Sequence, residues 1–397
     1  MQDMIMTLSS KTSRGKIDLL KKSEEVVKSL RLKNGGILAT PKDAAYPYVY
    51  TRDSVIISKA LNRIGMADAS EKFYYFMKKA VKVENYKEVF QRYTSSGLPS
   101  VTRKVQNDNE GLLLHGIYDT YLHNKKETFL ENMWTTVEQV VGLIFSYSRF
   151  GLVKTNSSIH EFKKLEKGYD LWVNCACYRG LKDAAKIAEI MNHKKESKEW
   201  DKKAEKIKGN IEKRLFNKKL KIYIKNKRFP DSPDISQLAP FYFNVDDDEK
   251  VLRNTLAYLR KHIWDGEIGG FRRFRKFEIC DDWHWYTGGS GSWCALTAMV
   301  ARFYKKVKNK RGYNECIKWL REVSFFSDGL LPEHIATKEE YDDWKSHEIE
   351  FNSRIINEMK KAEKSVKNFR GRKMVYWANP LGWSHAEYIL LRKDGLK

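Results

Sequence analysis

The chain has 397 residues, with 74 Lys and Arg against 51 Asp and Glu, which gives a formal net charge of +23. Apolar residues make up 42% of the sequence, a share that is normal for a globular protein and excludes a disordered chain. The 8 Pro and 23 Gly are fewer than turn-rich β-sandwiches generally need, and the chain is longer than most single cores. We therefore expect a helical protein, built as two domains or as one large closed architecture.

Apolar residues recur at helical spacing along most of the chain, as in the stripe Leu130, Met133, Val137 and Val140. No strong alternating pattern competes with this period, and no repeat or linker divides the chain. The spacing predicts twelve helices, at about residues 12–32, 52–64, 67–82, 108–123, 126–149, 170–192, 194–215, 234–243, 247–261, 289–306, 309–325 and 383–392. Twelve helices without a linker suit one all-α domain over residues 1–397, an (α/α)6 toroid of six helical hairpins.

Five of the predicted connections are long and rich in aromatic, Gly and charged residues. They cover residues 34–51, 86–107, 150–168, 265–288 and 327–383. If consecutive helices alternate in direction, these loops fall on one rim of the toroid. Long ordered loops of this kind usually carry function, so we expect a cleft at that rim.

Other features limit the partners and the compartment. No stretch of eighteen apolar residues and no secretory signal occurs, so we expect a cytoplasmic protein that does not contact a membrane. Five Cys without a CxxC pair are expected to be buried free thiols. The basic residues are densest in Lys194–Arg228, where they alternate with Glu and apolar residues. This alternation is typical of a solvated helical face, so nucleic acid is not an expected partner.

Two loops end in charged residues at predicted helix starts. Arg52 and Asp53 follow three tyrosines, including Tyr50, in YPYVYTRDS. The Asp could cap the helix, or the pair could bind sugar hydroxyls while an aromatic ring takes the apolar face of the sugar. Asp108, in VQNDNEG, could likewise be a site residue or an acidic residue favoured by the helix dipole.

Three further candidates lie in the later loops. The run GGFRRFRKFEICDDWHWYTGGSG places Trp285 beside a glycine-rich turn, and exposed aromatics there seldom serve packing alone. Glu161 lies in the third long loop and Glu333 in the fifth, 172 residues later. Taken singly, Glu161 could be a surface charge, and Glu333, which follows a proline, could be a first-turn residue of a helix.

Six blocks in order resemble the glucoamylase family, family 15 of the glycoside hydrolases. The blocks are YPYVYTRDS with a downstream AL-R-G, VQNDNEGLLLHGI, SPDISQLAPF, GGFRRF, GLLPEH and NPLGWSHAEYI. They run from about residue 35 to residue 389. The resemblance implies an (α/α)6 fold and an inverting mechanism, in which one carboxylic acid protonates the leaving oxygen and one carboxylate activates water.

The resemblance places the base at Glu333 and leaves two alignments for the acid. GYDLWVN looks like the fungal motif GYDLWEE, which would put Val173 at the acid and make the protein an inactive relative. The spacing to the helix that follows favours Glu161 instead, in IHEF. The mechanism then requires a drier setting for the acid than for the base.

Other site residues carry over by position. Arg52 and Asp53 match the residues that grip the terminal sugar, Tyr50 occupies the preceding aromatic site, and Arg273 matches the family's arginine, with Arg272 as the alternative. His160 stands where Trp is usual beside the acid, and His334 stands where Gln often follows the base.

The predicted function is therefore an exo-acting α-glucosidase that releases glucose from the non-reducing ends of α-glucans or gluco-oligosaccharides. Proton transfer needs no metal and no organic cofactor. The alternatives are a trehalase with the same two carboxylates, and an inactive relative that only binds glycans. We expect no β-sandwich domain of the kind found at the front of many prokaryotic members. The charged insertion at residues 341–375 is expected to be a solvated surface helix, or else a lid or partner contact.

Overall fold

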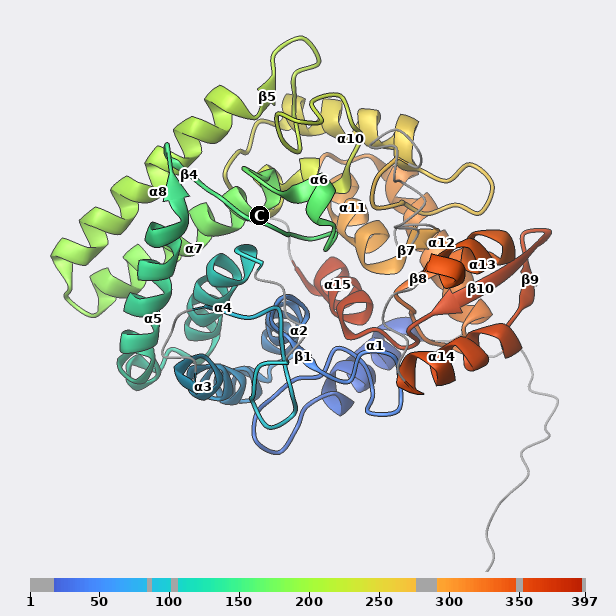
Figure 1. The fold of residues 1–397 in the computed structure, drawn as a ribbon, viewed down its shortest axis with the longest axis horizontal. Helices are drawn as coiled ribbons and strands as arrows, with labels where there is room; N and C mark the ends of the chain where they lie inside the picture. The colour runs from blue at the N-terminus through green and yellow to red at the C-terminus, as the bar shows by residue number, and fades with distance from the viewer. Residues whose placement is uncertain (1–17, 84–87, 101–105, 276–290, 348–352, 395–397) are drawn as a thin grey trace, which may run out of the picture.

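The computed structural model describes residues 18–83, 88–100, 106–275, 291–347 and 353–394. These residues form two concentric layers of helices that close into a ring (Figure 1). The inner layer consists of α2 (Thr51–Arg63), α4 (Asp108–Asn124), α7 (Leu171–Ile190), the short pair η1 (Ile235–Leu238) and α9 (Ala239–Tyr242), α11 (Cys294–Lys306) and α15 (Gly382–Lys393). The outer layer consists of α1 (Leu19–Ser29), α3 (Ala67–Val83), α5 (Glu127–Tyr147), α8 (Lys194–Arg214), α10 (Glu249–Ile263) and α12 (Lys310–Phe326). The expected (α/α)6 toroid is confirmed.

The burial of the helices follows the two layers. In α2 every residue from Thr51 to Asn62 is buried, as is every residue of α15 from Gly382 to Leu391. Helix α8 lies outside and buries one narrow stripe, namely Trp200, Ala204, Ile207 and Ile211. An inner helix is covered on all sides, whereas an outer helix needs only one apolar face.

Two predicted helices differ from the observed ones for local reasons. Helix α11 begins at Cys294 rather than near residue 289, because Gly291 has a φ of +77° and the strand β7 (Ser292–Trp293) comes first. The helix predicted at 234–243 is a 3-10 turn followed by one α-helical turn, with Pro240 at the start of the latter. The beginning of the helix predicted at 12–32 lies outside the described residues.

Strands were not expected, yet short ones are present. A four-stranded antiparallel sheet has the order β7–β8–β10–β9. Its members besides β7 are β8 (His334–Thr337), β9 (Lys367–Phe369) and β10 (Arg372–Trp377). Three further pairs are β1 (Val49–Tyr50) with β2 (Arg92–Tyr93), β3 (Ser148–Arg149) with β4 (Leu152–Val153), and β5 (Phe216–Asn217) with β6 (Ile222–Tyr223). All four residues of β8 are well covered, so no polar and apolar alternation marked it in the sequence.

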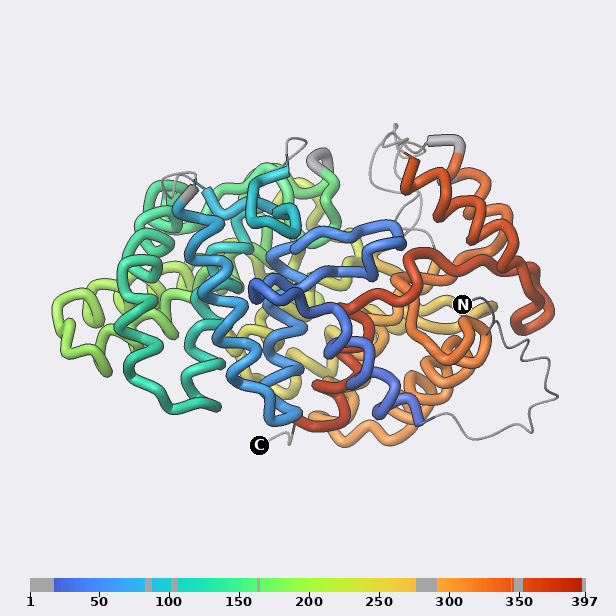
Figure 2. The backbone as a smooth tube through the Cα atoms, turned by 90° about the horizontal axis from the view of Figure 1, so that it is seen from below, coloured from blue at the N-terminus to red at the C-terminus, as the bar shows by residue number. Residues whose placement is uncertain are grey.

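The charged insertion forms a small layer of its own at the side of the ring (Figure 2). It contains α13 (Lys338–His347) and α14 (Ser353–Lys364) as well as β9 and β10. Ile355, Met359 and Ala362 of α14 pack with Tyr341 and Trp377 in a separate apolar cluster. The expectation of one solvated surface helix is therefore wrong, since these helices cover a core.

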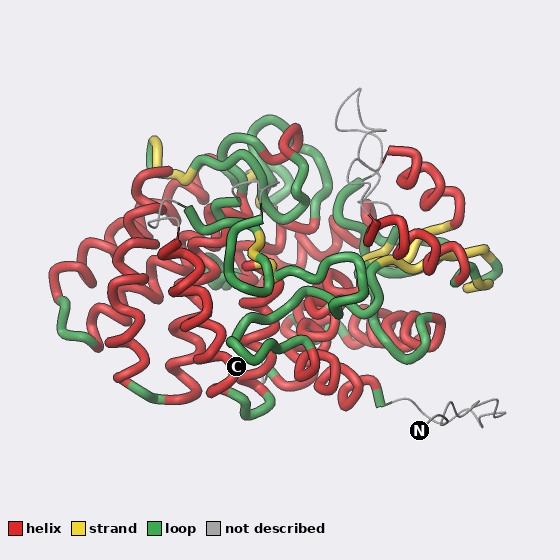
Figure 3. Tube along the Cα trace, turned by 60° about the horizontal axis from the view of Figure 1, so that its bottom comes forward, coloured by secondary structure: helices red, strands yellow, loops and turns green. Residues whose placement is uncertain are grey.

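The two ends of the ring differ. The long loops gather over one end (Figure 3), which also holds the small helix α6 (Lys163–Glu166). At the other end, Arg63 and Arg302 both pair with Asp394, at 2.7 and 2.9 Å, and Arg63 also pairs with Asp119. These ion pairs join α2, α4, α11 and the end of α15, which are four inner helices. Among the described residues, no helix is long and apolar enough to cross a bilayer.

Candidate active site

Arg52 links three of the long loops at the loop end of the ring. Its Nε donates to Asp108 Oδ2 at 2.9 Å and its Nη2 to Gln106 Oε1 at 2.7 Å, while Nη1 lies 3.8 Å from Glu161 Oε1. Trp172 Nε1, at the start of α7, donates to the same oxygen of Asp108 at 3.1 Å. The starts of α2, α4 and α7 therefore meet at one buried ion pair.

The two aspartates differ in how they relate to their helices. The N-cap of α2 is Tyr50, which makes no side-chain capping bond, so Asp53 lies in the first turn and is not the cap. Asp108 is the first residue of α4, where the helix dipole favours an acidic residue, and its carboxylate also binds Arg52 and Trp172.

Burial dominates the electrostatics of Asp53. It raises the pKa of Asp53 to about 7, the charge of Arg52 opposes this shift, and the charges of Glu161 and Glu333, which are 172 residues apart in the sequence, both add to it.

Glu161 lies on a tight loop held by another carboxylate. Its backbone has a φ of +61°, a left-handed conformation that is uncommon for a residue with a side chain, and its N–H donates to Ser158 O at 3.0 Å. Glu166 accepts hydrogen bonds from the backbone N–H groups of Ser158, His160 and Phe162, at 2.7, 2.7 and 3.1 Å. Surrounding contacts of this kind are what keep a strained residue in place.

Glu333 is held by its own main chain. Its N–H donates to the carbonyl oxygens of Trp377 and Ala378, at 3.0 and 3.2 Å, and its carbonyl accepts from Cys294 N at 3.1 Å. It is thereby fixed between the end of β10 and the start of α11. The ring of His334 stacks on Trp293 at 5.2 Å, and its Nδ1 lies 3.7 Å from Glu333 Oε2.

The two arginines of GGFRRF have different surroundings. Arg273 is buried, its Nη1 donates to the carbonyl of His160 at 3.3 Å, and its guanidinium lies 4.3 Å from the ring centre of Trp293. Arg272 instead bonds to Asp265 at 2.5 Å and to Glu340 at 2.7 Å. Arg272 is thus occupied by two carboxylates elsewhere, and Arg273 is the arginine beside the Glu161 loop.

The aromatic candidates are only partly described. Tyr50 Oη accepts from Arg92 Nη1 at 2.5 Å, and its ring makes edge contacts with Tyr46 and Tyr48. Trp285 lies outside the described residues.

His160 differs from its expected place in the cleft. Its side chain is fully buried, and Nε2 lies 2.9 Å from both carboxylate oxygens of Asp234. Burial lowers the pKa of this histidine to about 3, so the neutral ring donates its Nε2 proton to Asp234. His160 therefore supports the loop beneath Glu161.

Sequence reasoning missed the charged residues under this loop. Lys225, Glu166, Asp170 and Asp234 are all fully buried and lie together. Lys225 lies within the basic stretch that was interpreted as a solvated face, and for this residue that interpretation is wrong. Its partners come from two other segments of the chain, so no local pattern marked it.

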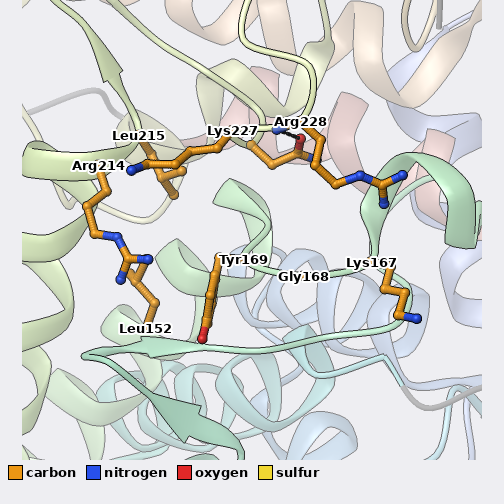
Figure 4. A pocket seen from close by; sticks show the side chains of 9 residues that line it. Leu152, Lys167, Gly168, Tyr169, Arg214, Leu215, Lys227 and Arg228 are labelled. Atoms are coloured by element: carbon orange, nitrogen blue, oxygen red, sulfur yellow. Dashed lines mark hydrogen bonds between the residues drawn. The ribbon is translucent and has the colours of Figure 1, made fainter.

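A cavity of about 170 Å³ lies on the outer side of the same segments (Figure 4). Tyr169 and the stems of Lys167, Arg214, Lys227 and Arg228 line it, together with Leu152, Gly168, Leu215 and Asn226. None of the candidate catalytic or sugar-binding residues is among them. This cavity is therefore separate from the site around Asp53.

The comparisons with known proteins agree with a glycosidase fold. Residues 117–272 match the model of the mannosylglycerate hydrolase MGH1-like glycoside hydrolase domain. An uncharacterized glycosyl hydrolase of Methanocaldococcus jannaschii is 26% identical over 326 residues, which are 76% of this chain and 49% of that protein. The chain thus spans about half the length of the curated relative that it matches.

Solved structures show the same architecture at low identity. A wild-type glycosidase is 17% identical with a TM-score of 0.71, covering 94% of this chain and 95% of that one. A bacterial glucoamylase complexed with acarbose is 19% identical with a TM-score of 0.68, covering 94% and 55%. The glucoamylase of Saccharomycopsis fibuligera is 15% identical with a TM-score of 0.62, covering 97% and 96%. The chain has the fold of the six-hairpin glycosidase superfamily. The likeness to glucoamylases is one of fold and does not define a substrate.

Proposed function

We propose that the protein is an inverting glycoside hydrolase in which Glu161 is the general acid and Glu333 the general base. The observation that carries the proposal is that Arg273 connects the surroundings of the two glutamates. Its Nη1 donates to the carbonyl of His160, the residue before Glu161, and its guanidinium lies against Trp293, which stacks on His334, the residue after Glu333. Both remain accessible, with side chains 36% and 16% exposed, whereas Arg52, Asp53 and Arg273 are buried around them. Such a site can hold a terminal hexose on fixed polar groups and still admit water.

In the proposed reaction, Glu161 protonates the glycosidic oxygen while Glu333 takes a proton from the attacking water. Water attacks the face of the sugar opposite the leaving group, so the configuration at the anomeric carbon inverts. Arg52 and Asp53 bind hydroxyls of the terminal ring. The greater exposure of Glu161 is the reverse of the drier setting expected for the acid. We infer that the bound substrate supplies this drier setting by covering Glu161.

An inactive glycan-binding relative is the weaker proposal. It was favoured by Val173 at the acid position and by the two unusual histidines. Val173 is fully buried in the first turn of α7, whereas Glu161 lies beside Arg52 at the site. His160 is bonded to Asp234 below the loop, so it does not occupy the place of a substrate.

Two classes of substrate are proposed. The resemblance to glucoamylases favours α-glucosides, with trehalose as a rival to maltooligosaccharides. The match of residues 117–272 to a mannosylglycerate hydrolase domain spans Glu161 and favours a glycoside of a small acid. The net charge of +23 also favours an anionic substrate. A panel of maltotriose, isomaltose, trehalose and mannosylglycerate distinguishes these candidates.

The test combines this panel with two isosteric variants. We expect Glu161→Gln and Glu333→Gln each to lower kcat by several orders of magnitude on the preferred glycoside. Proton NMR during the first turnovers should show the released sugar as the β-anomer from an α-glycoside. A glycosyl fluoride, whose leaving group needs no protonation, should restore Glu161→Gln but not Glu333→Gln. Near-normal turnover of the glycoside by either variant would refute its assigned role.

A further inference from the structure

A fully buried ionic cluster lies beneath the Glu161 loop. Lys225 Nζ lies 3.1 Å from Asp170 Oδ2, 3.5 Å from Asp234 Oδ2 and 3.7 Å from Glu166 Oε1. All four side chains are inaccessible to solvent. Three carboxylates thus share one ammonium group as their cation, and all of them come from segments that precede inner helices.

Every carboxylate of the cluster also bonds to the loop that carries Glu161. Glu166 accepts the N–H groups of His160 and Phe162, the two residues on either side of Glu161. Asp170 Oδ1 accepts from Ser158 Oγ at 2.9 Å, and Asp234 accepts from His160 Nε2. The position of the Glu161 backbone is therefore set from both sides by groups that converge on Lys225.

The same cluster connects to the loop that carries Arg273. Ile235 N donates to Arg273 O at 2.8 Å, and Arg275 N donates to Pro233 O at 3.2 Å, so this loop pairs with the segment that carries Asp234. Arg273 in turn donates to the carbonyl of His160. Hydrogen bonds therefore join the loop that carries Glu161, the segment that carries Asp234 and the loop that carries Arg273.

General stability does not explain such a cluster. Well-packed apolar residues often replace a buried ion group without loss, because the desolvation of the charges offsets most of their attraction. Hydrogen-bonded groups have preferred lengths and directions, whereas apolar packing is non-directional, so the bonded carboxylates define the geometry of the loop more narrowly than its apolar contacts do. Glu161 is on this loop, in a left-handed conformation.

We propose that Lys225 is a positioning residue for the general acid: its ammonium group is the cation that Glu166, Asp170 and Asp234 share, and it thereby holds the Glu161 loop in place against the leaving group. This inference rests on the proposed roles of Glu161 and Glu333. It assigns Lys225 no contact with the substrate. Its effect is expected on acid catalysis and not on the attack of water.

The test compares two substrates in Lys225→Met, which keeps the length of the side chain and removes its charge. On the preferred glycoside, we expect kcat to fall by about 100-fold, the loss that a displacement of about 1 Å produces. On the matching glycosyl fluoride, which needs no acid, we expect kcat within about threefold of the wild type. Lys227→Met, two residues along the same segment and exposed, is the control and should behave as the wild type on both substrates.

Glu166→Gln provides a second variant with the same shape if Lys225→Met does not fold. Its amide would direct N–H groups at the backbone N–H groups that the carboxylate now accepts, and we expect the same difference between the two substrates. An equal loss on glycoside and fluoride, in either variant that folds, would overturn the inference by showing a general structural role.

The inference and the proposed function can fail separately. If Glu161→Gln shows the difference between substrates and neither cluster variant does, the acid is correctly assigned and the role of Lys225 is wrong. If Glu161→Gln itself shows no difference, the proposed function is wrong and the inference falls with it.

Discussion

Asp53 should make the folded protein less stable as the pH rises. Its pKa is raised from 3.8 to about 7, chiefly by burial, with further contributions from Glu161 and Glu333. Below pH 3.8 both the folded and the unfolded chain hold this proton. Between 3.8 and 7 the unfolded chain releases it first, which favours unfolding. The stabilisation of the folded state by protonated Asp53 is therefore fully present below pH 3.8 and is lost as the pH rises through 7.

The size of this effect follows from the shift of the pKa. A shift of about 3 units corresponds to about 4 kcal/mol over the whole range. Between pH 5 and pH 8 the same two pKa values give a loss of about 2.5 kcal/mol. Asp53 is buried, so solvent screening calls for little reduction of this value. Asp53→Asn cannot titrate and should lack this part of the pH dependence.

The assay is urea unfolding of the wild type and of Asp53→Asn at pH 5 and pH 8. At each pH, the free energy of unfolding of the variant is subtracted from that of the wild type. The quantity of interest is the change in this difference between pH 5 and pH 8. Titrating groups that the substitution leaves unchanged contribute equally to both proteins and cancel. We expect the variant to gain about 2.5 kcal/mol relative to the wild type from pH 5 to pH 8, while glycoside hydrolysis falls at both. If the two proteins differ in free energy of unfolding by the same amount at pH 5 and at pH 8, the reasoning is refuted.

Three further predictions concern stability. Lys225→Met should lower the free energy of unfolding by about 3–5 kcal/mol, because it leaves buried carboxylates without their cation, and denaturant titration measures this. Burial raises the pKa of Glu110 to about 8, so Glu110→Gln should gain stability relative to the wild type as the pH rises from 4.5 through 8, as melting curves at several pH values would show. Gly111→Ala should destabilise by about 1–3 kcal/mol, since a Cβ there would lie 2.3 Å from the backbone of Ala176. Gly142→Ala, where nothing lies within 4 Å, should instead stabilise by about 0.5–1 kcal/mol, and equal effects of the two glycine variants would contradict the close approach of α4 and α7.

The ring of helices could be predicted because its signal is local. Leu130, Met133, Val137 and Val140 recur at helical spacing, and all four are fully buried where α5 packs on its neighbours. The small layer formed by residues 341–375 carried a similar signal that its charges obscured. Ile355, Met359 and Ala362 follow the spacing of one helical face, and they cover a core of their own.

The residues of the candidate site also differ in whether the sequence alone reveals them. The blocks that contain Arg52 and Glu333 could be recognised because they follow one another in the sequence as they do in a known family, and Glu161 was proposed from its spacing to the helix that follows. The buried cluster could not be found, because Lys225 lies among exposed basic residues and its carboxylate partners come from segments before and after it. Whether a lysine is solvated or buried depends on groups that only the folded ring brings together.

The different ways of holding the two glutamates follow from where each lies on the ring. Glu333 is bonded through its main chain to the end of β10 and to the start of α11, so regular structure fixes it without help from side chains. Glu161 lies on a loop, and contacts of the two neighbouring residues hold its left-handed backbone in place. A general acid must nevertheless stand within hydrogen-bond reach of the leaving oxygen, and a small displacement is costly. A cluster of fixed charges beneath a loop is thus the counterpart, on the acid side, of the sheet and helix that hold the base.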